Sequence, residues 1–288
     1  MKCNWSHYNE KLVRRGEIFI SIDVIQRWDK ELSEMNRQKE GRRFLFPESF
    51  MKVVGYARVY LGLPYRQTEG LLRTYGNTIP KVPDYSVIHR RVNKLDIRIE
   101  PHLGSDIVIA IDSTGIKVAN RGEWMRDKWK MRRGFLKIHV GVDVSSKKIV
   151  SAKITDERSH DAQHLPSLVE QALYHGKAVK VLADAAYDSK NNFSYLYHND
   201  IVPGIKVRKN SSGRSGGCYP RKVSVISQLK MYQYWKDSVS YGKRWIVESV
   251  FSVLKRIFGE HVMAHKRQNM TKELQLKMAL YNQFVSAQ

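Results

Sequence analysis

Three acidic residues stand at positions where a carboxylate is unusual. Asp112 lies inside the apolar stretch VIAIDSTG, and Asp184 directly follows the apolar stretch VKVLA. Glu248 lies in the middle of YGKRWIVESVFSVLKRIFG, residues 241–259, where the absence of proline predicts a helix. A carboxylate in a buried strand is costly unless it is paired or binds a cation. We therefore expect Asp112 and Asp184 to share a task that requires their charge.

The predicted helix at 241–259 has two distinct faces. At about 100° per residue, four polar side chains fall within a roughly 60° arc: Tyr241, Arg244, Glu248 and Lys255. The apolar residues fall on another side, as expected for a helix packed on a sheet. Taken alone, the helix could simply be exposed, with an Arg244–Glu248 pair worth roughly 0.2–0.5 kcal/mol. The two aspartates upstream favour the other interpretation, in which the polar face looks onto a site.

The middle of the chain predicts an α/β fold. Three β-branched segments are followed by a helix with Asp161 as a possible N-cap, and then by strands that alternate with helices. This order of three strands, helix, strand, helix, strand and helix predicts a mixed sheet flanked by helices, and it is the order of the ribonuclease-H-like fold. In that fold the first and fourth strands are neighbours. Asp112 and Asp184 would then meet, and the last helix would add Glu248.

An all-helical region precedes the predicted sheet. Helical spacing and end signals predict helices over 47–62, 65–76 and 84–95, the last with Asp84 as its N-cap. The last of these helices is basic and includes Arg90 and Arg91, which favours a helix-turn-helix type of DNA-binding unit over an ordinary helical bundle with a solvated basic face.

Three domains follow from these patterns. We expect a helical N-terminal DNA-binding and dimerisation domain at 1–103 and a catalytic domain at 104–262. The remaining segment, 263–288, predicts an amphipathic helical tail that packs on the core or on a second protomer.

The charge of the chain indicates a polyanionic partner. The sequence has 50 Lys and Arg against 28 Asp and Glu, a net charge of +22. Nucleic acid is the commonest partner of such a chain. No apolar run reaches the roughly 18 residues of a membrane span, and the first residues lack the apolar core of a signal peptide. Two cysteines are too few for a disulfide framework. We expect a cytoplasmic, nucleoid-associated protein without a membrane partner.

Two segments are especially basic. Residues 117–137 carry eight Lys and Arg against two acids, together with Trp124, Arg132 and Arg133. Cations there could bind a DNA backbone while a tryptophan stacks on unpaired bases, although a solvated hairpin with packed tryptophans has the same pattern. The second segment, KNSSGRSGGCYPRK at 209–222, predicts a mobile basic loop that either contacts DNA or only connects two elements. We expect Asp188, in AYDS, to be the N-cap of the helix that follows it.

Three converging carboxylates would suit two divalent cations. Hard oxygen ligands select Mg²⁺ or Mn²⁺. Two such ions about 4 Å apart can activate an attacking oxygen and stabilise a leaving oxygen in phosphoryl transfer. Arg244 and Lys255 suit DNA phosphates as partners, and the Tyr241 hydroxyl could donate to a phosphate oxygen.

These residues together resemble those of a known family, the DDE transposases of bacterial and archaeal insertion sequences. Tyr241, Arg244, Glu248 and Lys255 match every spacing of the Tyr-x2-Arg-x3-Glu-x6-Lys signature of the insertion-sequence-four and insertion-sequence-five types. AIDSTG and LADAAYDS resemble the blocks around the two catalytic aspartates, and LPYRQTEGLLRTYG with VPDYSVIHRRV resembles the helical region before the core. The interval of 64 residues between Asp184 and Glu248 leaves no room for the large β insertion of some relatives.

The resemblance implies a transposase that cleaves DNA at element ends and joins those ends to target DNA. Asp112, Asp184 and Glu248 would hold the metal ions, and Tyr241, Arg244 and Lys255 would hold DNA near the cleaved strand. The implied partners are double-stranded DNA, as terminal inverted repeats and target, and a second copy of the chain assembled on it.

Two other functions remain open. One is a domesticated relative that only binds DNA, and the other is a nuclease or Holliday-junction resolvase of the same fold. The complete set of acids favours the active transposase over the first. The basic helical N-terminal region favours it over the second.

Overall fold

The chain folds into two compact units. Unit 1 comprises Met1–Arg98 and Val262–Gln288, and unit 2 comprises Ile99–His261. The computed structural model describes residues 5–17, 23–99, 106–118, 135–214 and 216–286. Trp124, Arg132 and Arg133, for which we predicted DNA contacts, lie outside the described residues.

Unit 1 is built from helices α1 (Trp5–Glu17), α2 (Asp23–Gln26), α3 (Trp28–Asn36), α4 (Glu48–Leu61), α5 (Tyr65–Thr74), α6 (Tyr85–Val92) and α13 (Arg267–Ser286). Helix α4 ends where Gly62 adopts a left-handed conformation with φ of 64°, which glycine tolerates without strain. Asp84 caps α6 as predicted, because its carboxylate accepts hydrogen bonds from the backbone N–H of Ser86 (2.8 Å) and Val87 (2.9 Å). The sequence patterns did not predict α1 to α3.

The C-terminal helix α13 belongs to the same unit as the N-terminal helices. It packs against α4, and its buried Glu273 forms an ion pair with Arg58 of α4. The carboxylate accepts hydrogen bonds from the N–H groups of Met263 and Ala264, and it pairs with Lys277 at 3.1 Å and Arg58 at 4.0 Å. The segment that the sequence set apart as a tail is therefore integrated into unit 1.

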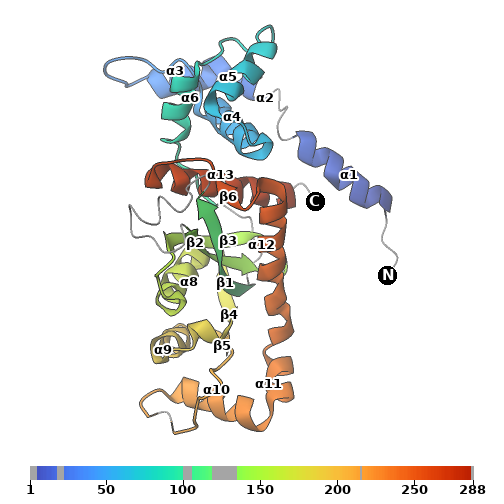
Figure 1. The fold of residues 1–288 in the computed structure, drawn as a ribbon, viewed down its shortest axis with the longest axis vertical. Helices are drawn as coiled ribbons and strands as arrows, with labels where there is room; N and C mark the ends of the chain where they lie inside the picture. Colours follow the sequence, from blue (N-terminus) through green and yellow to red (C-terminus); the bar gives the residue numbers. More distant parts are fainter. Residues whose placement is uncertain (1–4, 18–22, 100–105, 119–134, 215, 287–288) are drawn as a thin grey trace. The chain divides into compact units, whose positions relative to one another are not determined.

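Unit 2 is organised around a mixed sheet, drawn in green and yellow in Figure 1. Its strands are β1 (Asp106–Val118), β2 (Phe135–Asp143), β3 (Ile149–Asp156), β4 (Lys177–Ala183) and β5 (Val202–Ile205), and the two-residue strand β6 (His261–Val262) spans the boundary with unit 1. The order is β3-β2-β1-β4-β5. Strand β2 is antiparallel to β1 and β3, whereas β4 is parallel to β1 and β5. This topology confirms the predicted ribonuclease-H-like fold.

Helices cover both faces of this sheet (Figure 1). Helices α8 (Leu165–Leu173) and α9 (Lys190–His198) lie on one face, and α12 (Trp245–Phe258) packs on β1 and β2 from the other. Alternate residues of β1, namely Ile107, Ile109 and Ile111, join the buried core under α8 and α9. Strand β5 approaches β4 closely at Gly204, where a Cβ would lie 2.5 Å from the Leu182 side chain.

The segment before α12 differs from the sequence prediction. Helices α10 (Tyr219–Lys230) and α11 (Tyr232–Ser238) occupy part of the predicted basic loop and the residues after it. The predicted helix at 241–259 is divided into a 3-10 turn, η3 (Tyr241–Arg244), and α12. Ser240 precedes η3 in a left-handed conformation with φ of 55°.

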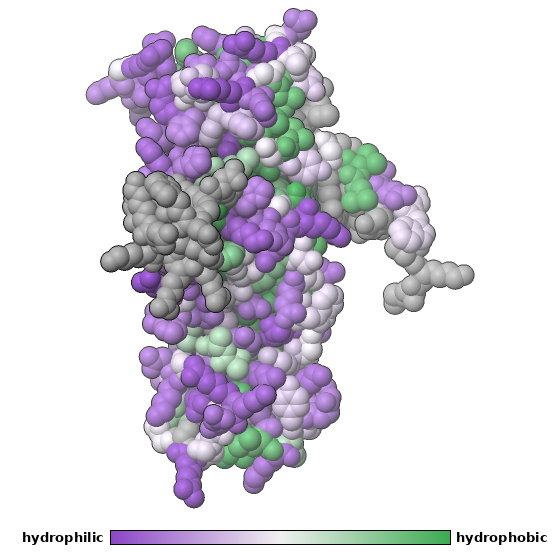
Figure 2. Space-filling model, in the orientation of Figure 1, coloured by the Kyte–Doolittle hydropathy of each residue, from purple (hydrophilic) through white to green (hydrophobic). Residues whose placement is uncertain are grey.

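The surface of the α10–α11 hairpin is partly apolar. In Figure 2, green patches lie among purple ones at the bottom of the view, where Figure 1 labels α10 and α11. The exposed apolar side chains of this segment include Leu229 and Met231. None of the described helices has the length and apolar character needed to cross a membrane.

Candidate active site

Asp112 is the central acid of the site. It lies on β1 opposite Val140 of β2, on the sheet face that α12 covers, and its side chain is 19% exposed. The carboxylate accepts a hydrogen bond from the N–H of Ser113 (2.8 Å) and one from Nη1 of Arg244 (3.1 Å). The interior of a strand thus holds a carboxylate that pairs with Arg244, the last residue of η3.

Asp184 lies on the neighbouring strand because of the parallel register. It directly follows Ala183, the last residue of β4, and Ala183 pairs with Ile111 beside Asp112. Its carboxylate accepts a hydrogen bond from the N–H of Ala186 (2.9 Å) and so caps the 3-10 turn η2 (Ala185–Tyr187). The strand end and this turn place Asp184 at the same edge as Asp112.

Glu248 comes to the site from the first turn of α12. Its side chain is 53% exposed, and Nη2 of Arg244 donates a hydrogen bond to it. Because the same guanidinium also contacts Asp112, Arg244 spans two of the three acids. Buried Val247 and Val250 hold this helix on the sheet.

The charges of the other two acids act on Asp112. Burial raises the pKa of the Asp112 carboxyl, and the negative charges of Asp184 and Glu248 raise it further. The Ser113 N–H and the charge of Arg244 act in the opposite direction. An added cation near Asp112 would therefore be favoured by three carboxylates rather than one.

The donor chemistry fits a hard divalent cation, although the acids are not gathered as ligands. Carboxylate oxygens are the ligands that Mg²⁺ and Mn²⁺ prefer. Within the described ranges, no group of three or more His, Cys, Asp and Glu side chains is arranged to hold a metal ion. Arg244 lies between Asp112 and Glu248. Collecting these two acids around one ion therefore requires Arg244 to release at least one of them.

Tyr241 and Lys255 lie at opposite ends of the segment formed by η3 and α12. Tyr241 is half-buried in η3, with its ring centroid 5.0 Å from that of Trp235. Burial, and to a smaller extent the charge of Asp184, raise the pKa of Tyr241 to about 12, while Arg244 opposes them. The phenol is therefore protonated at neutral pH and can donate a hydrogen bond. Lys255 is half-buried in the last turn of α12.

The two predicted DNA contacts of α6 differ in their surroundings. Arg90 is exposed. Arg91 is half-buried: its Nη2 donates to the carbonyl oxygen of Phe46 (3.3 Å), and its guanidinium lies 4.4 Å from the centre of the Phe44 ring. Arg91 therefore already stabilises the packing of unit 1.

Two aspartates that the sequence assigned to helix caps have other roles. Ser189, not Asp188, caps α9 by accepting a hydrogen bond from the N–H of Asn192 (3.2 Å). The Asp188 side chain is fully buried and binds Arg221 through Nε (2.7 Å) and Nη2 (2.9 Å). Asp161 is the first residue of the 3-10 turn η1 (Asp161–His164) rather than its N-cap, which is His160, and it pairs with Lys137 at 2.6 Å. Local sequence could not distinguish these roles, because each partner lies more than 20 residues away.

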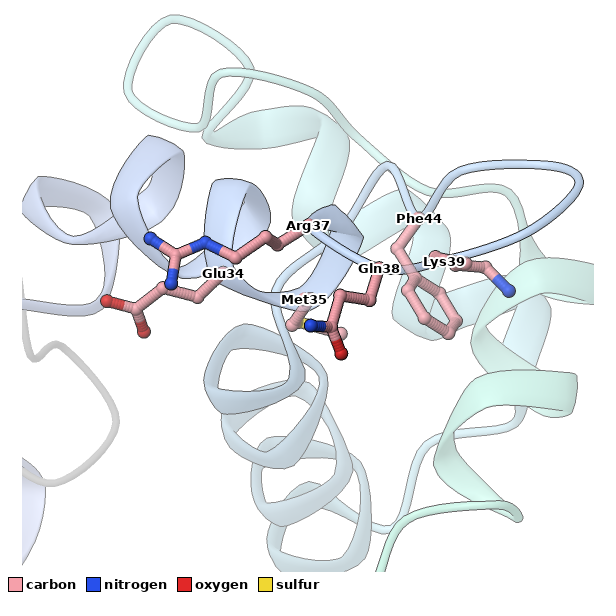
Figure 3. Close-up of a pocket in the computed structure, with 6 residues that line it drawn as sticks. All are labelled: Glu34, Met35, Arg37, Gln38, Lys39 and Phe44. Atoms are coloured by element: carbon pink, nitrogen blue, oxygen red, sulfur yellow. The ribbon is translucent and has the colours of Figure 1, made fainter.

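Unit 1 contains a separate pocket of about 440 Å³ (Figure 3). Its lining residues come from α3 and the following loop: Glu34, Met35, Arg37, Gln38, Lys39 and Phe44. The Lys39 ammonium lies 4.4 Å from the centre of the Phe44 ring. None of the three acids of unit 2 contributes to this pocket.

Two family profiles match this chain. A family profile described as "Transposase DDE domain" matches residues 103–283, and a second profile with the same description matches residues 13–121. The chain therefore belongs to the transposase DDE domain family, and a transposase function follows at that level.

Two similar solved structures are much more remote. One is a piggyBac transposase synaptic complex with hairpin DNA, at 11% identity and a TM-score of 0.41, with 96% of this chain and 74% of that chain covered. The other is a simian T-cell lymphotropic virus intasome in complex with PP2A regulatory subunit B56 gamma, at 14% identity and a TM-score of 0.27, with 67% of each chain covered.

Proposed function

We propose that this chain is a DNA transposase of the insertion-sequence-four or insertion-sequence-five type, and that Asp112, Asp184 and Glu248 hold two Mg²⁺ or Mn²⁺ ions. The observation that carries the proposal is the placement of the three acids: Ile111 pairs with Ala183, so that Asp112 and Asp184 follow paired residues of neighbouring strands, and Arg244 contacts both Asp112 and Glu248. Bound ions would activate the attacking oxygen and stabilise the leaving oxygen of a phosphodiester.

The reaction has two steps of the same kind. Water attacks a phosphorus atom at the element end, and the bond to the 3′ oxygen breaks to leave a 3′-hydroxyl and a 5′-phosphate. The 3′-hydroxyl then attacks a phosphodiester of the target, so that one phosphodiester bond forms as another breaks. The joining step therefore requires no external energy source.

The cations around the acids receive roles in DNA binding. Arg244 releases the carboxylates and turns its planar fork to a phosphate of the bound strand, a geometry that guanidinium groups favour. Tyr241 donates its O–H to a phosphate oxygen, which its raised pKa permits throughout the physiological range. Lys255, in the last turn of α12, supplies a further positive charge to the DNA backbone.

The remaining basic regions form the rest of the DNA-binding surface in this proposal. The helices before residue 104 recognise the terminal inverted repeats. The exposed Arg90 contacts the DNA directly, whereas the half-buried Arg91 mainly supports the packing of unit 1. Trp124, Arg132 and Arg133 supply further DNA contacts. Two copies assemble on DNA because two element ends have to be brought together, and the protein works at the nucleoid.

A cleavage assay tests the proposal. The substrate is a supercoiled plasmid that carries the inverted repeats flanking the gene, incubated with Mg²⁺. We expect wild-type protein to nick and join this DNA, and we expect Asp112→Asn, Asp184→Asn and Glu248→Gln to lose both activities while they retain DNA affinity. Glu260→Gln is the matched control, because Glu260 is 57% exposed and belongs to the same unit.

Two results would contradict the proposal. Unchanged cleavage by any of the three acid variants would remove that residue from the site. DNA binding by the wild-type protein with no cleavage at any metal concentration would favour a protein that only binds DNA.

A further inference from the structure

Positive charge is concentrated in the segment that follows α3 in unit 1, residues 37–44, which we call the α3–α4 loop. Its sequence, RQKEGRRF, has one acid, Glu40, and four cationic residues. The cationic residues are Arg37, Lys39, Arg42 and Arg43. Arg42 and Arg43 are exposed, and neither forms an ion pair with another described residue. Their guanidinium groups are therefore available to a ligand from outside the chain.

One side chain holds the two ends of the α3–α4 loop together. Asn36, the last residue of α3, accepts a hydrogen bond from the N–H of Phe44 (2.7 Å) and donates one from Nδ2 to the carbonyl oxygen of Phe44 (3.0 Å). Gly41 turns the chain within the loop, with a φ of 77° that favours glycine. The cations thus lie on a closed loop, and compact surface loops with adjacent ends are frequently functional.

The closed loop is attached to the basic helix α6. The Phe44 ring centre lies 4.4 Å from the Lys39 ammonium and 4.4 Å from the guanidinium carbon of Arg91. Arg91 also donates a hydrogen bond to the carbonyl oxygen of Phe46 (3.3 Å). Figure 3 shows Lys39 and Phe44 together at the base of the loop. The exposed Arg90 precedes Arg91 on α6, so the loop and the basic end of α6 lie next to each other.

Exposed arginines of this kind suit phosphate groups. The planar guanidinium donates two parallel hydrogen bonds to phosphate oxygens, and contacts with the DNA backbone position a protein without reading the base sequence. We propose that the α3–α4 loop binds the phosphate backbone of duplex DNA beside α6, with Arg42 and Arg43 as its contacts. Asn36 positions these contacts by closing the loop. The inference rests on the proposed function, and it assigns to the loop a sequence-independent share of the binding.

Fluorescence anisotropy with the full-length chain tests the proposal in the absence of divalent cations. The probes are a labelled inverted-repeat duplex and a scrambled duplex of the same length, each measured from about 50 to 200 mM salt. Each phosphate contact contributes about 0.9 to the slope of log K against log salt concentration. We expect the double variant Arg42→Gln, Arg43→Gln to make this slope shallower by about 1.8 on both duplexes. Its affinity for both duplexes should fall by the same factor.

A second pair of arginines in unit 1 provides the matched control. Arg73 and Arg98 are 72% and 71% exposed, but they pair with Glu69 and Asp96. The double variant Arg73→Gln, Arg98→Gln removes the same charge from the unit and should leave the slope unchanged.

A third variant tests the closure of the loop. Asn36→Ala keeps every charge but removes both hydrogen bonds to Phe44. We expect it to weaken binding to both duplexes, with a melting temperature close to that of wild type.

The outcomes separate this inference from the proposed function. A wild-type salt slope for Arg42→Gln, Arg43→Gln would overturn the inference, as would an equal change of slope in the control variant. A loss of affinity confined to the inverted repeat would also overturn it, because the loop would then read bases. Wild-type affinity of Asn36→Ala would overturn the role given to loop closure. Failure of the wild-type chain to bind either duplex would overturn the proposed function itself.

Discussion

The buried pair of Asp188 and Arg221 offers a direct test of how unit 2 is held together. The Asp188 side chain is fully buried, and its carboxylate accepts hydrogen bonds from Nε and Nη2 of Arg221, the N–H of Arg208 (3.0 Å) and the Ser211 hydroxyl (3.3 Å). These contacts attach the basic segment and the start of α10 to the turn that follows Asp184. The perturbation is Asp188→Asn, which removes the charge and keeps the size.

The expected loss follows from the contacts. Removing one member of a buried ion pair typically costs about 3–5 kcal/mol, because the partner is left without its counterion. Arg221 is 15% exposed and can regain some water, which places the cost near the lower end, at about 3 kcal/mol. For a unit of this size, each kcal/mol lowers the melting temperature by about 2–4 °C, so we expect a decrease of roughly 6–12 °C.

The pH dependence gives a second, independent signature. Hydrogen bonds and the charge of Arg221 outweigh burial and hold the pKa of Asp188 below its usual range. A depressed pKa in the folded state contributes stability above the unfolded pKa of about 3.9, and this contribution is lost as pH falls through the folded pKa. The difference in stability between wild type and Asp188→Asn should be constant above about pH 5 and should narrow below about pH 4.

Differential scanning calorimetry, with Trp235 fluorescence as a probe of unit 2, measures both signatures. Asp200→Asn is the control, since Asp200 is exposed and its φ of 56° suits asparagine. A melting temperature of Asp188→Asn within about 2 °C of wild type at pH 7 would refute the reasoning, because it corresponds to less than about 1 kcal/mol. The reasoning would also be refuted if the difference in stability between wild type and Asp188→Asn did not narrow below about pH 4.

Two further predictions concern other charged contacts. Glu273→Gln should destabilise unit 1 by about 3 kcal/mol, because it removes the carboxylate that pairs with the buried side chains of Arg58 and Lys277. Urea denaturation measures this loss, with the exposed Glu260→Gln as control, and equal midpoints for wild type and Glu273→Gln would contradict the prediction. Arg244→Gln should tighten Mn²⁺ binding severalfold in the absence of DNA, because it removes the cation that spans Asp112 and Glu248, while it weakens binding to duplex DNA. Weaker Mn²⁺ binding by this variant, measured by calorimetry, would show that Arg244 does not compete with the metal.

Local sequence patterns predicted the strands and caps that depend on near neighbours. The β-branched runs around Asp112 and Asp184 are short, and each determines its own strand before any long-range contact is made. The capping of α6 by Asp84 needs only residues two and three positions away. These are features whose physical causes lie within a few residues of chain.

Contacts between distant residues were not predictable in the same way. The pairing of Asp188 with Arg221 and of Asp161 with His139 depends on the tertiary fold and strand register, and isolated helix-start patterns suggested caps at both aspartates. Helices α10 and α11 were missed because the Gly- and Ser-rich residues before them favour a loop, while their own stability comes partly from packing of Val225 and Trp235. The place of α13 in unit 1 depends in part on the pairing of Glu273 with Arg58 of α4, which is distant in the sequence.

The central claim is that Asp112, Asp184 and Glu248 act together as metal ligands. The most direct measurement is anomalous scattering from Mn²⁺ in crystals of the chain bound to its inverted-repeat DNA. The account predicts anomalous peaks within coordination distance, about 2.0–2.3 Å, of carboxylate oxygens from all three residues, with Arg244 turned to a DNA phosphate. Peaks that avoid these carboxylates, or Arg244 still spanning Asp112 and Glu248 in the DNA complex, would contradict it.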